Sequence, residues 1–255
     1  MLEYTNEFYK TYQEGSRRSA KEIIPLIFEL IQPKSVIDVG CGIGTWLSVL
    51  KEFGVEDIIG VDGDYISKEM LQIPVECFLS FDLKKPFRIE RQFDLVLSLE
   101  VAEHLPSKSA STFVDSLVRL GPVILFSAAI PFQGGTNHIN EQWPDYWVKL
   151  FQNNGYIVID CIRNKIWQND FIETWYVQNI MIFCKQDYLE SNSLLRKEFE
   201  NTNKSKLSIV HPNVYLGTIE GADPRNMSLI KMLSVLPVVS KRAFKRIIKN
   251  ILFNK

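Results

Sequence analysis

The chain has 255 residues, of which 46% are hydrophobic and 23% are charged, and its 29 Lys and Arg nearly balance its 30 Asp and Glu. This ordinary composition excludes a disordered or low-complexity chain, and the length fits one large α/β domain or a domain with an appendage rather than two full domains. A net charge of -1 argues against a general nucleic-acid binder, whose affinity would rest on neutralising phosphates.

Cysteine spacing and the N-terminal segment lead us to expect a cytoplasmic protein. The four cysteines are far apart and form no CxxC pair, so neither a zinc knuckle nor a disulfide framework is expected: Cys41, Cys77, Cys161 and Cys184. Residues 1–14 mix charged and aromatic side chains, which does not fit a signal peptide. No stretch reaches the ~20 apolar residues that a membrane span needs.

Helical hydrophobic patterns alternate with short apolar runs through the first part of the chain. We predict helices over residues 16–31, 45–50, 109–120 and 144–153. Strands are predicted over residues 35–39, 57–61, 75–79, 93–97, 122–126, 156–162 and 180–185. This alternation predicts parallel βαβ units with right-handed crossovers, closed by an antiparallel pair of strands at the sheet edge. We expect this domain to cover residues 1–187.

Residues 188–255 differ in composition and are expected to form a C-terminal helical extension. Residues 191–206 are polar with little apolar periodicity, which favours a helix or tether over more core. The end of the chain carries basic residues without an acidic one: Lys241, Arg242, Lys245, Arg246, Lys249 and Lys255. Its apolar residues recur at helical spacing on one face: Phe244, Ile247, Ile248, Ile251 and Leu252. Residues 240–255 therefore predict a basic amphipathic helix that rests on an anionic membrane or a partner, or packs on the domain or a second subunit.

Polar residues and glycines follow the predicted strands, where ligands of open parallel sheets bind. Gly40, Gly42 and Gly44 form GxGxG rather than GxGxxG, since Thr45 takes the last position, so a dinucleotide is not the best ligand. Glycines without Cβ atoms allow close approach of a ligand to the turn. The alternative is a tight turn without a ligand.

Two acidic residues stand at the ends of the next two strands. Asp62 is placed to accept both hydroxyls of a ribose, and Asp82 to accept a proton from an adenine amino group. Together they favour adenosine without phosphates. The alternative is that both are solvent-facing loop acids.

These motifs resemble the class I S-adenosylmethionine-dependent methyltransferases over about residues 15 to 187. The matching segments are residues 36–44, 60–62, 81–83 and 93–97. The resemblance implies a Rossmann-like, seven-stranded, mostly parallel sheet with helices on both faces, and S-adenosylmethionine as cofactor. It also implies a set of cofactor-binding positions: Asp38, Gly40, Gly42, Gly44, Asp62, Gly63, Asp82, Leu83 and Leu99. Residues 133–144 look like a signature of bacterial methyltransferases from surface-polysaccharide gene clusters.

A second group of residues follows the fourth predicted strand. If a helix begins near Glu100, then Glu100, Glu103 and His104 share one face. This spacing resembles the ExxEH site of small-RNA terminal 2′-O-methyltransferases and of a ubiquinone-pathway O-methyltransferase, where a divalent metal holds the acceptor oxygens; His138 would then be a fourth ligand. Such a donor set suits manganese, iron or zinc better than magnesium, which is not excluded. The alternatives are His104 or His138 as general base, with Glu103 beside them, or a purely structural role.

The sequence thus predicts a methyltransferase acting on an oxygen of a saccharide or nucleotide-linked precursor of capsule or another surface glycan. The other acceptors considered are a phosphate-derived glycan substituent, an RNA terminus and a quinone. A catalytically silent cofactor-binding scaffold for glycan assembly at the membrane is the alternative from another class. Peripheral attachment to the inner face of the membrane would involve residues 240–255.

Overall fold

The computed structural model describes the backbone of residues 6–253 and the side chains of residues 13–230 and 232–242. Its strands are β1 (Ser35–Val39), β2 (Asp57–Asp62), β3 (Phe78–Ser80), β4 (Leu95–Leu99), β5 (Val123–Ser127), β6 (Tyr156–Ile159) and β7 (Met181–Lys185). Its helices in the first unit are α1 (Asn6–Phe28), α2 (Thr45–Glu52), α3 (Ala110–Leu117), α4 (Pro144–Gln152), α5 (Ile162–Ile166), α6 (Thr174–Asn179), α7 (Gln186–Ser191) and α8 (Ser193–Asn201).

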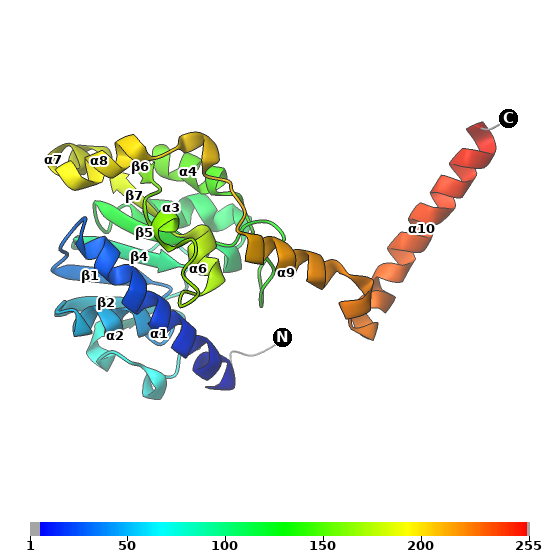
Figure 1. The fold of residues 1–255 in the computed structure, drawn as a ribbon. Helices are drawn as coiled ribbons and strands as arrows, with labels where there is room; N and C mark the ends of the chain where they lie inside the picture. The colour runs from blue at the N-terminus through cyan, green and yellow to red at the C-terminus, as the bar shows by residue number, and fades with distance from the viewer. Residues whose placement is uncertain (1–5, 254–255) are drawn as a thin grey trace. The chain divides into compact units, whose positions relative to one another are not determined.

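The seven strands form one sheet in the order β3-β2-β1-β4-β5-β7-β6 (Figure 1). The first five strands in this order are parallel, whereas β7 runs antiparallel to both β5 and β6. This confirms the predicted mostly parallel, seven-stranded α/β fold and the antiparallel pair at one edge. The order reverses beside β1, where ligands of open α/β sheets bind.

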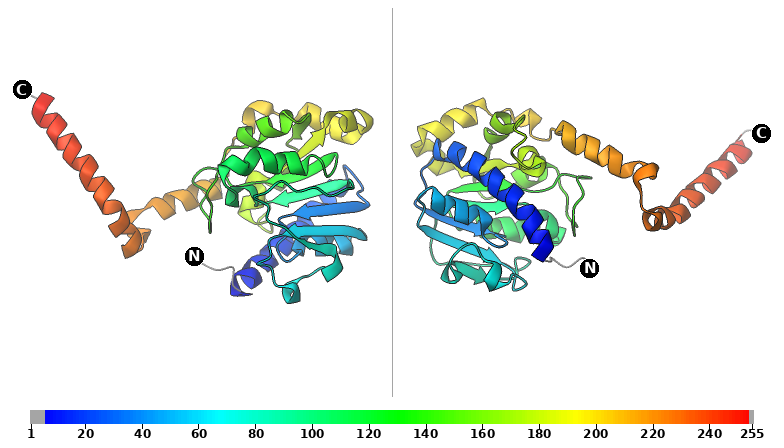
Figure 2. Two further views of the ribbon diagram at one scale, coloured as in Figure 1. Left: turned by 180° about the vertical axis from the view of Figure 1, so that it is seen from behind. Right: turned by 60° about the horizontal axis from the view of Figure 1, so that its bottom comes forward.

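Alternating strand residues feed two separate hydrophobic cores. In β1, Val36 packs into one core and Ile37 into the other, and Leu95 and Val96 of β4 divide in the same way. Helices α1, α2, α5 and α6 cover the first face, and α3 and α4 cover the second, as seen from behind in Figure 2. Strands buried on both faces explain the continuous apolar runs in the sequence.

Several boundaries differ from the sequence-based predictions. Helix α1 starts at Asn6 rather than at residue 16 and continues through Pro25. The strand expected over residues 75–79 is shorter, because residues Val75–Cys77 form a 3-10 turn that starts after Pro74 and leaves only Phe78–Ser80 in the sheet.

The first compact unit extends from Met1 to Val214, beyond the boundary expected at residue 187. Leu189, Leu195 and Leu207 are buried in the two cores, so the segment read as a helix or tether contributes apolar contacts of its own. The Nε2 atom of His211 lies 2.9 Å from the carbonyl oxygen of Trp167.

The second compact unit is Tyr215–Lys255. It holds most of α9 (Pro212–Ala222), a 3-10 turn at Pro224–Asn226, and α10 (Leu229–Phe253). The backbone of α10 contains most of the helix expected over residues 240–255, while the side chains from residue 243 onward lie outside the described residues. Among the residues that the structure describes, no helix is long and apolar enough to cross a membrane.

Candidate functional site

The glycine turn after β1 is a tight left-handed segment. Gly40, Gly42 and Gly44 have φ values of 88°, 55° and 84°, a region that side chains with a Cβ rarely adopt. A Cβ on Gly40 would lie 2.2 Å from Cγ2 of Val101, so the close packing at this position requires glycine as well. The chain enters α2 directly after Gly44, and the turn therefore presents bare backbone at the carboxyl end of β1.

Asp62, the last residue of β2, is tied to this turn. Its side chain is 5% exposed, and its carboxylate accepts hydrogen bonds from the backbone N–H of Gly42 at 2.7 Å and of Gly63 at 2.6 Å. The hydroxyl of Tyr65 donates a third hydrogen bond to the same carboxylate. A ribose hydroxyl is a donor of the same kind, so Asp62 has the chemistry that the resemblance implies for it.

Of the other residues that the resemblance implies for cofactor binding, some are exposed and some are buried. Asp82 lies on the exposed loop after β3 and accepts a hydrogen bond from the backbone N–H of Lys84 at 3.1 Å. Leu83 and Leu99 are each 8% exposed and belong to opposite cores. Because β3, β2, β1 and β4 are neighbours, these residues all lie at or just after strand ends at one edge of the sheet.

Asp38, in β1, is 3% exposed. Burial, with a further contribution from the Asp62 carboxylate, raises the pKa of Asp38 to about 7. A carboxyl group held in this way favours a cationic group placed beside it.

Glu100 does not begin a helix, which corrects the sequence-based expectation. Its φ is 55°, and its backbone N–H donates to both the carbonyl and the side-chain oxygen of Ser127, each at 3.0 Å. Only Ala102–His104 form a turn, of 3-10 type. The side chain of Glu100 contacts Asn179 and Gln133, and its carboxyl group also interacts with that of Glu103. Burial raises the pKa of Glu100 to about 7.

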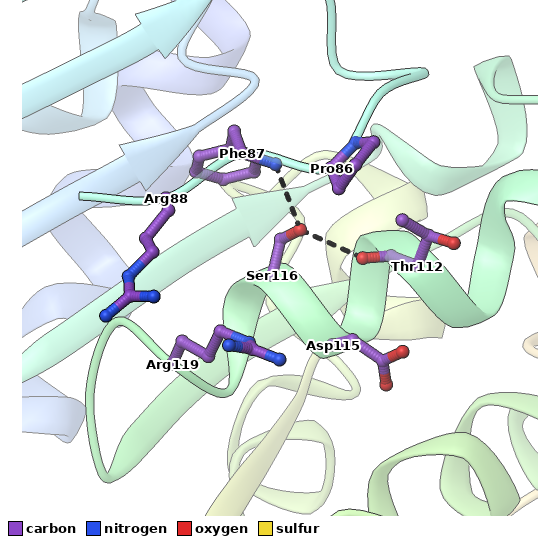
Figure 3. Close-up of a pocket in the computed structure, with 7 residues that line it drawn as sticks. All are labelled: Pro86, Phe87, Arg88, Thr112, Asp115, Ser116 and Arg119. Carbon is purple, nitrogen blue, oxygen red and sulfur yellow. Dashed lines mark hydrogen bonds between the residues drawn. The ribbon is translucent and has the colours of Figure 1, made fainter.

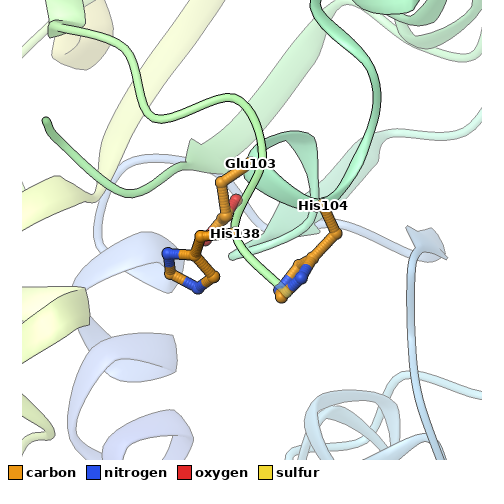
Figure 4. A group of neighbouring side chains, drawn as sticks. All are labelled: Glu103, His104 and His138. Carbon is orange, nitrogen blue, oxygen red and sulfur yellow. The ribbon is translucent and has the colours of Figure 1, made fainter. Parts of the chain in front are cut away.

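Glu103, His104 and His138 come together in one cluster (Figure 4). One ligand atom from each lies within 4.8 Å of the others, and the two imidazole rings are 4.9 Å apart at an interplanar angle of 88°. Among the described residues, this is the group of His, Cys, Asp and Glu with spacing suited to a metal ion, and Glu100 is not part of it.

The cluster contains buried polar atoms without partners. Both carboxylate oxygens of Glu103 and Nδ1 of His104 are buried and make no hydrogen bond. Burial, together with the neighbouring Glu100 carboxylate, raises the pKa of Glu103 well above its usual range. Burial and the neighbouring His138 lower the pKa of His104 to about 4, so this imidazole is neutral near pH 7 and can accept a proton or a metal ion.

The loop between β5 and α4 holds His138 in place. The carboxylate of Glu141 lies 3.1 Å from Nδ1 of His138. It also accepts hydrogen bonds from the backbone N–H groups of Phe132 and Gly134, each at 2.8 Å. The backbone N–H of Asn140 donates to the carbonyl oxygen of Glu103 at 3.0 Å. Sequence reasoning assigned no role to Glu141, although it lies inside the segment 133–144 that was singled out.

One surface hollow lies apart from these residues. It has a volume of about 320 Å³ and lies beside α3, where the Ser116 hydroxyl accepts the backbone N–H of Phe87 (Figure 3). Its lining includes Arg88 and Arg119 and shares no residue with the glycine turn or the histidine cluster. We assign no function to it.

Comparisons with known proteins give one family. A family model described as a methyltransferase domain matches residues 12–175. The chain is 30% identical over 110 residues to a mitochondrial ubiquinone biosynthesis O-methyltransferase of Dictyostelium discoideum, covering 36% of this chain and 34% of that protein. It is 35% identical over 102 residues to an ajmaline N-methyltransferase of Rauvolfia serpentina, covering 35% of this chain and 33% of that protein. The chain thus matches about a third of the length of these curated relatives.

Solved structures are similar in fold. The magnesium protoporphyrin IX methyltransferase of Synechocystis PCC 6803 with bound SAM has a TM-score of 0.51 and 17% identity, over 71% of this chain and 85% of that one. DesVI of Streptomyces venezuelae has a TM-score of 0.52 and 17% identity, over 70% of this chain and 95% of that one. At such identities the likeness is one of fold alone.

The role of Asp62 is tested by calorimetry with S-adenosylhomocysteine. We expect Asp62→Ala to weaken binding at least about tenfold, or about 1.4 kcal/mol, because a buried acceptor for the ribose is lost. Asp64→Ala is the matched control, since this neighbouring acid is exposed. Unchanged affinity in a folded Asp62→Ala protein would remove the ribose assignment.

Burial of the Asp38 carboxyl group is expected to make the stability of the fold depend on pH. Its pKa is raised on folding, so the carboxyl group destabilises the ligand-free fold increasingly as the pH rises from the unfolded-state value of 3.8 towards about 7. We expect Asp38→Asn to raise Tm more at about pH 8 than at about pH 5, with 1 kcal/mol corresponding to about 2–4 °C. Thermal melts without cofactor measure this; an equal difference at both pH values would contradict it.

Proposed function

The chain belongs to the class I S-adenosylmethionine-dependent methyltransferases, and from that premise we propose that it transfers a methyl group to an oxygen atom of a saccharide or nucleotide-linked precursor of a surface glycan. The observation that supports oxygen as the acceptor atom is the cluster of Glu103, His104 and His138. A hydroxyl group must lose a proton during transfer, and the cluster offers the neutral imidazole of His104 beside a buried carboxyl group.

The transfer itself is an in-line displacement. The acceptor oxygen forms a bond to the methyl carbon while the bond from this carbon to the sulfonium sulfur breaks, and the electron pair stays on sulfur to give neutral S-adenosylhomocysteine. The hydroxyl proton moves to His104 or His138. Alignment of donor and acceptor supplies much of the rate, and the glycine turn and Asp62 would fix the donor.

The same cluster fits a divalent cation. Its donor set is one carboxylate and two imidazoles with unpartnered buried atoms, and the Glu141 carboxylate beside Nδ1 of His138 is the arrangement that orients a metal-binding imidazole. We therefore propose that Glu103, His104 and His138 hold manganese, iron, zinc or magnesium, without the Glu100 ligand that the sequence predicted. When bound, the cation would acidify the acceptor hydroxyl.

Exposed aromatic side chains near the cluster support a saccharide acceptor. Phe132 is 80% exposed and Trp143 is 42% exposed, and both lie in the loop that also carries His138. Sugars stack their apolar faces on such rings. The resemblance of residues 133–144 to methyltransferases of surface-polysaccharide clusters supports the same acceptor, whereas the net charge of -1 counts against RNA.

We also propose that α10 brings the enzyme to the anionic inner face of a membrane. Apolar side chains are exposed along its first part, with Leu229, Ile230 and Leu233 at 71%, 82% and 55%. Lys241 and Arg242 follow and are exposed, and four more basic residues without an acidic one complete the chain. Burial of apolar area and attraction to anionic lipid act together in such helices.

Incubation with S-adenosylmethionine and a panel of nucleotide sugars tests the reaction. We expect mass spectrometry to detect a nucleotide sugar that has gained one methyl group, and a severe loss of product in His104→Ala and His138→Ala. Methylation of a quinone, an RNA end or a phosphate-derived group would replace the saccharide proposal. Turnover of none of these acceptors would favour a silent cofactor-binding scaffold.

Chelation of the wild-type protein distinguishes the cation from a purely basic role. We expect activity to fall after metal removal and to return with manganese or magnesium. Full activity of the metal-free protein would remove the cation and leave the imidazoles as bases. Glu141→Gln should lower activity less than His138→Ala, because it changes only the partner of that ring.

Flotation with liposomes containing anionic lipid tests the membrane proposal. We expect the full-length protein to float at low salt and less at high salt, a chain ending at Val239 to float weakly, and a chain ending at Asn226 to stay in the dense fractions. If the full-length protein also stays there, the membrane proposal is wrong. A change in oligomeric state between these chains would then assign α10 to a subunit contact.

A further inference from the structure

The carboxylate of Glu141 binds three parts of the loop between β5 and α4. Its Oε2 accepts a hydrogen bond from the backbone N–H of Phe132, and its Oε1 accepts one from the backbone N–H of Gly134, each at 2.8 Å. The same Oε1 lies 3.1 Å from Nδ1 of His138. Because a carboxylate has acceptor atoms only, we infer that Nδ1 carries the proton of this imidazole. In the neutral ring, Nε2 then keeps a free lone pair.

The backbone of this loop bends around the carboxylate. Phe132, Gly134 and Asn137 have φ values of 70°, 73° and 60°, in the left-handed region. This region is disfavoured for a residue as bulky as Phe132 and persists only where the surroundings impose it. The two N–H groups directed at Glu141 are such a restraint, because backbone N–H groups of a left-handed turn form a concave site for an anion. Glu141 therefore helps to set the direction in which the Phe132 side chain leaves the loop.

The side chain of Phe132 projects from the loop. It is 80% exposed, although phenylalanine is among the residues most often buried. Ile139 and Trp143, in the same loop, are 61% and 42% exposed. A disfavoured backbone conformation that holds an aromatic ring in solvent, on a loop with further exposed apolar side chains, favours a binding surface over a structural role.

The loop is also fixed to the segment that carries His104. The backbone N–H groups of Ile139 and Asn140 both donate to the carbonyl oxygen of Glu103, at 2.9 Å and 3.0 Å. The rings of His138 and His104 meet from two different loops, as Figure 4 shows. The contact with Glu141 therefore orients a ring that already lies in the cluster.

We propose that Glu141 is a positioning residue for two parts of the acceptor site. One part is the ring of Phe132, which would contact the acceptor and determine which acceptor fits. The other is His138, which Glu141 keeps in the tautomer with a free Nε2. The proposal rests on the proposed proton transfer at the histidine cluster, but on no particular acceptor. It makes binding of the acceptor and removal of its proton depend on the same carboxylate.

Replacement of Glu141 by Gln tests whether both oxygens are needed. Three N–H groups point at the two carboxylate oxygens, whereas an amide has one oxygen and an NH2 group that cannot accept. In Glu141→Gln, either the Phe132 N–H or the donors of Gly134 and His138 must therefore face another donor. Asp145→Asn is the matched control, since it makes the same change of charge at an exposed residue of the following helix.

Nitrogen-15 NMR of the protein after chelation reports the tautomer, and the chain has only three histidines to assign. We expect His138 to carry its proton on Nδ1 in the wild type and in Asp145→Asn. In Glu141→Gln, either this tautomer is lost or the amide proton of Phe132 moves upfield, because the amide cannot serve both. A wild-type His138 protonated on Nε2 would overturn the proposal, and so would a Glu141→Gln protein in which neither signal changes.

Kinetics with whichever acceptor is methylated test the coupling. We expect Phe132→Ala to raise the KM for the acceptor about fivefold and to leave kcat and the His138 tautomer unchanged. Glu141→Gln should raise this KM and lower kcat, whereas Asp145→Asn should change neither. An unchanged KM in Phe132→Ala would remove its ring from the acceptor site. If no acceptor is methylated, the proposed function fails, while the NMR signals still decide whether Glu141 positions the loop.

Discussion

The parallel run of β3, β2, β1, β4 and β5 is the constraint on which both proposed sites depend. Parallel strands place their carboxyl ends at one edge, so residues far apart in sequence become neighbours there without local contacts to guide them. The hydrogen bond from the Gly42 N–H to the Asp62 carboxylate joins two of these ends. The bond from the Glu100 N–H to Ser127 joins two others. The antiparallel β7 extends the same edge by bringing Asn179 to it.

Several buried carboxyl groups lie at this edge of the sheet, and their burial lowers the stability of the fold. Asp38, Asp62, Glu100 and Glu103 all have pKa values raised by burial. Carboxyl groups in such surroundings destabilise the ligand-free fold once they ionise, and the loss is offset when a cation is bound. A cofactor with a sulfonium and an ammonium group supplies two positive charges, so binding and stability are expected to be linked.

Sequence reasoning succeeded where the signal is local and failed where it depends on the path of the chain. The strand patterns and the glycine motif predicted the sheet and the turn at Gly40, because apolar runs and glycine spacing are formed by residues that are adjacent in the sequence. The helix start expected at Glu100 was wrong, since this residue has a left-handed backbone and its N–H bonds to Ser127 on the neighbouring strand. Asn179 carried no signal at all, because its position follows from the direction of β7. The buried positions of Leu195 and Leu207 were not predicted, because each is an isolated apolar residue in a polar stretch and forms no periodic pattern.

Glu100 and Glu103 are two buried carboxyl groups, three residues apart, whose side chains interact with each other. A side chain that only holds the donor makes the same contact before and during transfer, so its attraction cannot by itself lower the barrier. Glu103 and the two imidazoles face the acceptor, where a proton is lost only as the new bond forms. Interactions that strengthen in the transition state raise the rate, whereas those that persist unchanged only tighten binding. The left-handed backbone at Glu100 turns its side chain towards Asn179 and Gln133 while its carboxyl group still interacts with that of Glu103, so ionisation of one carboxyl group disfavours ionisation of the other.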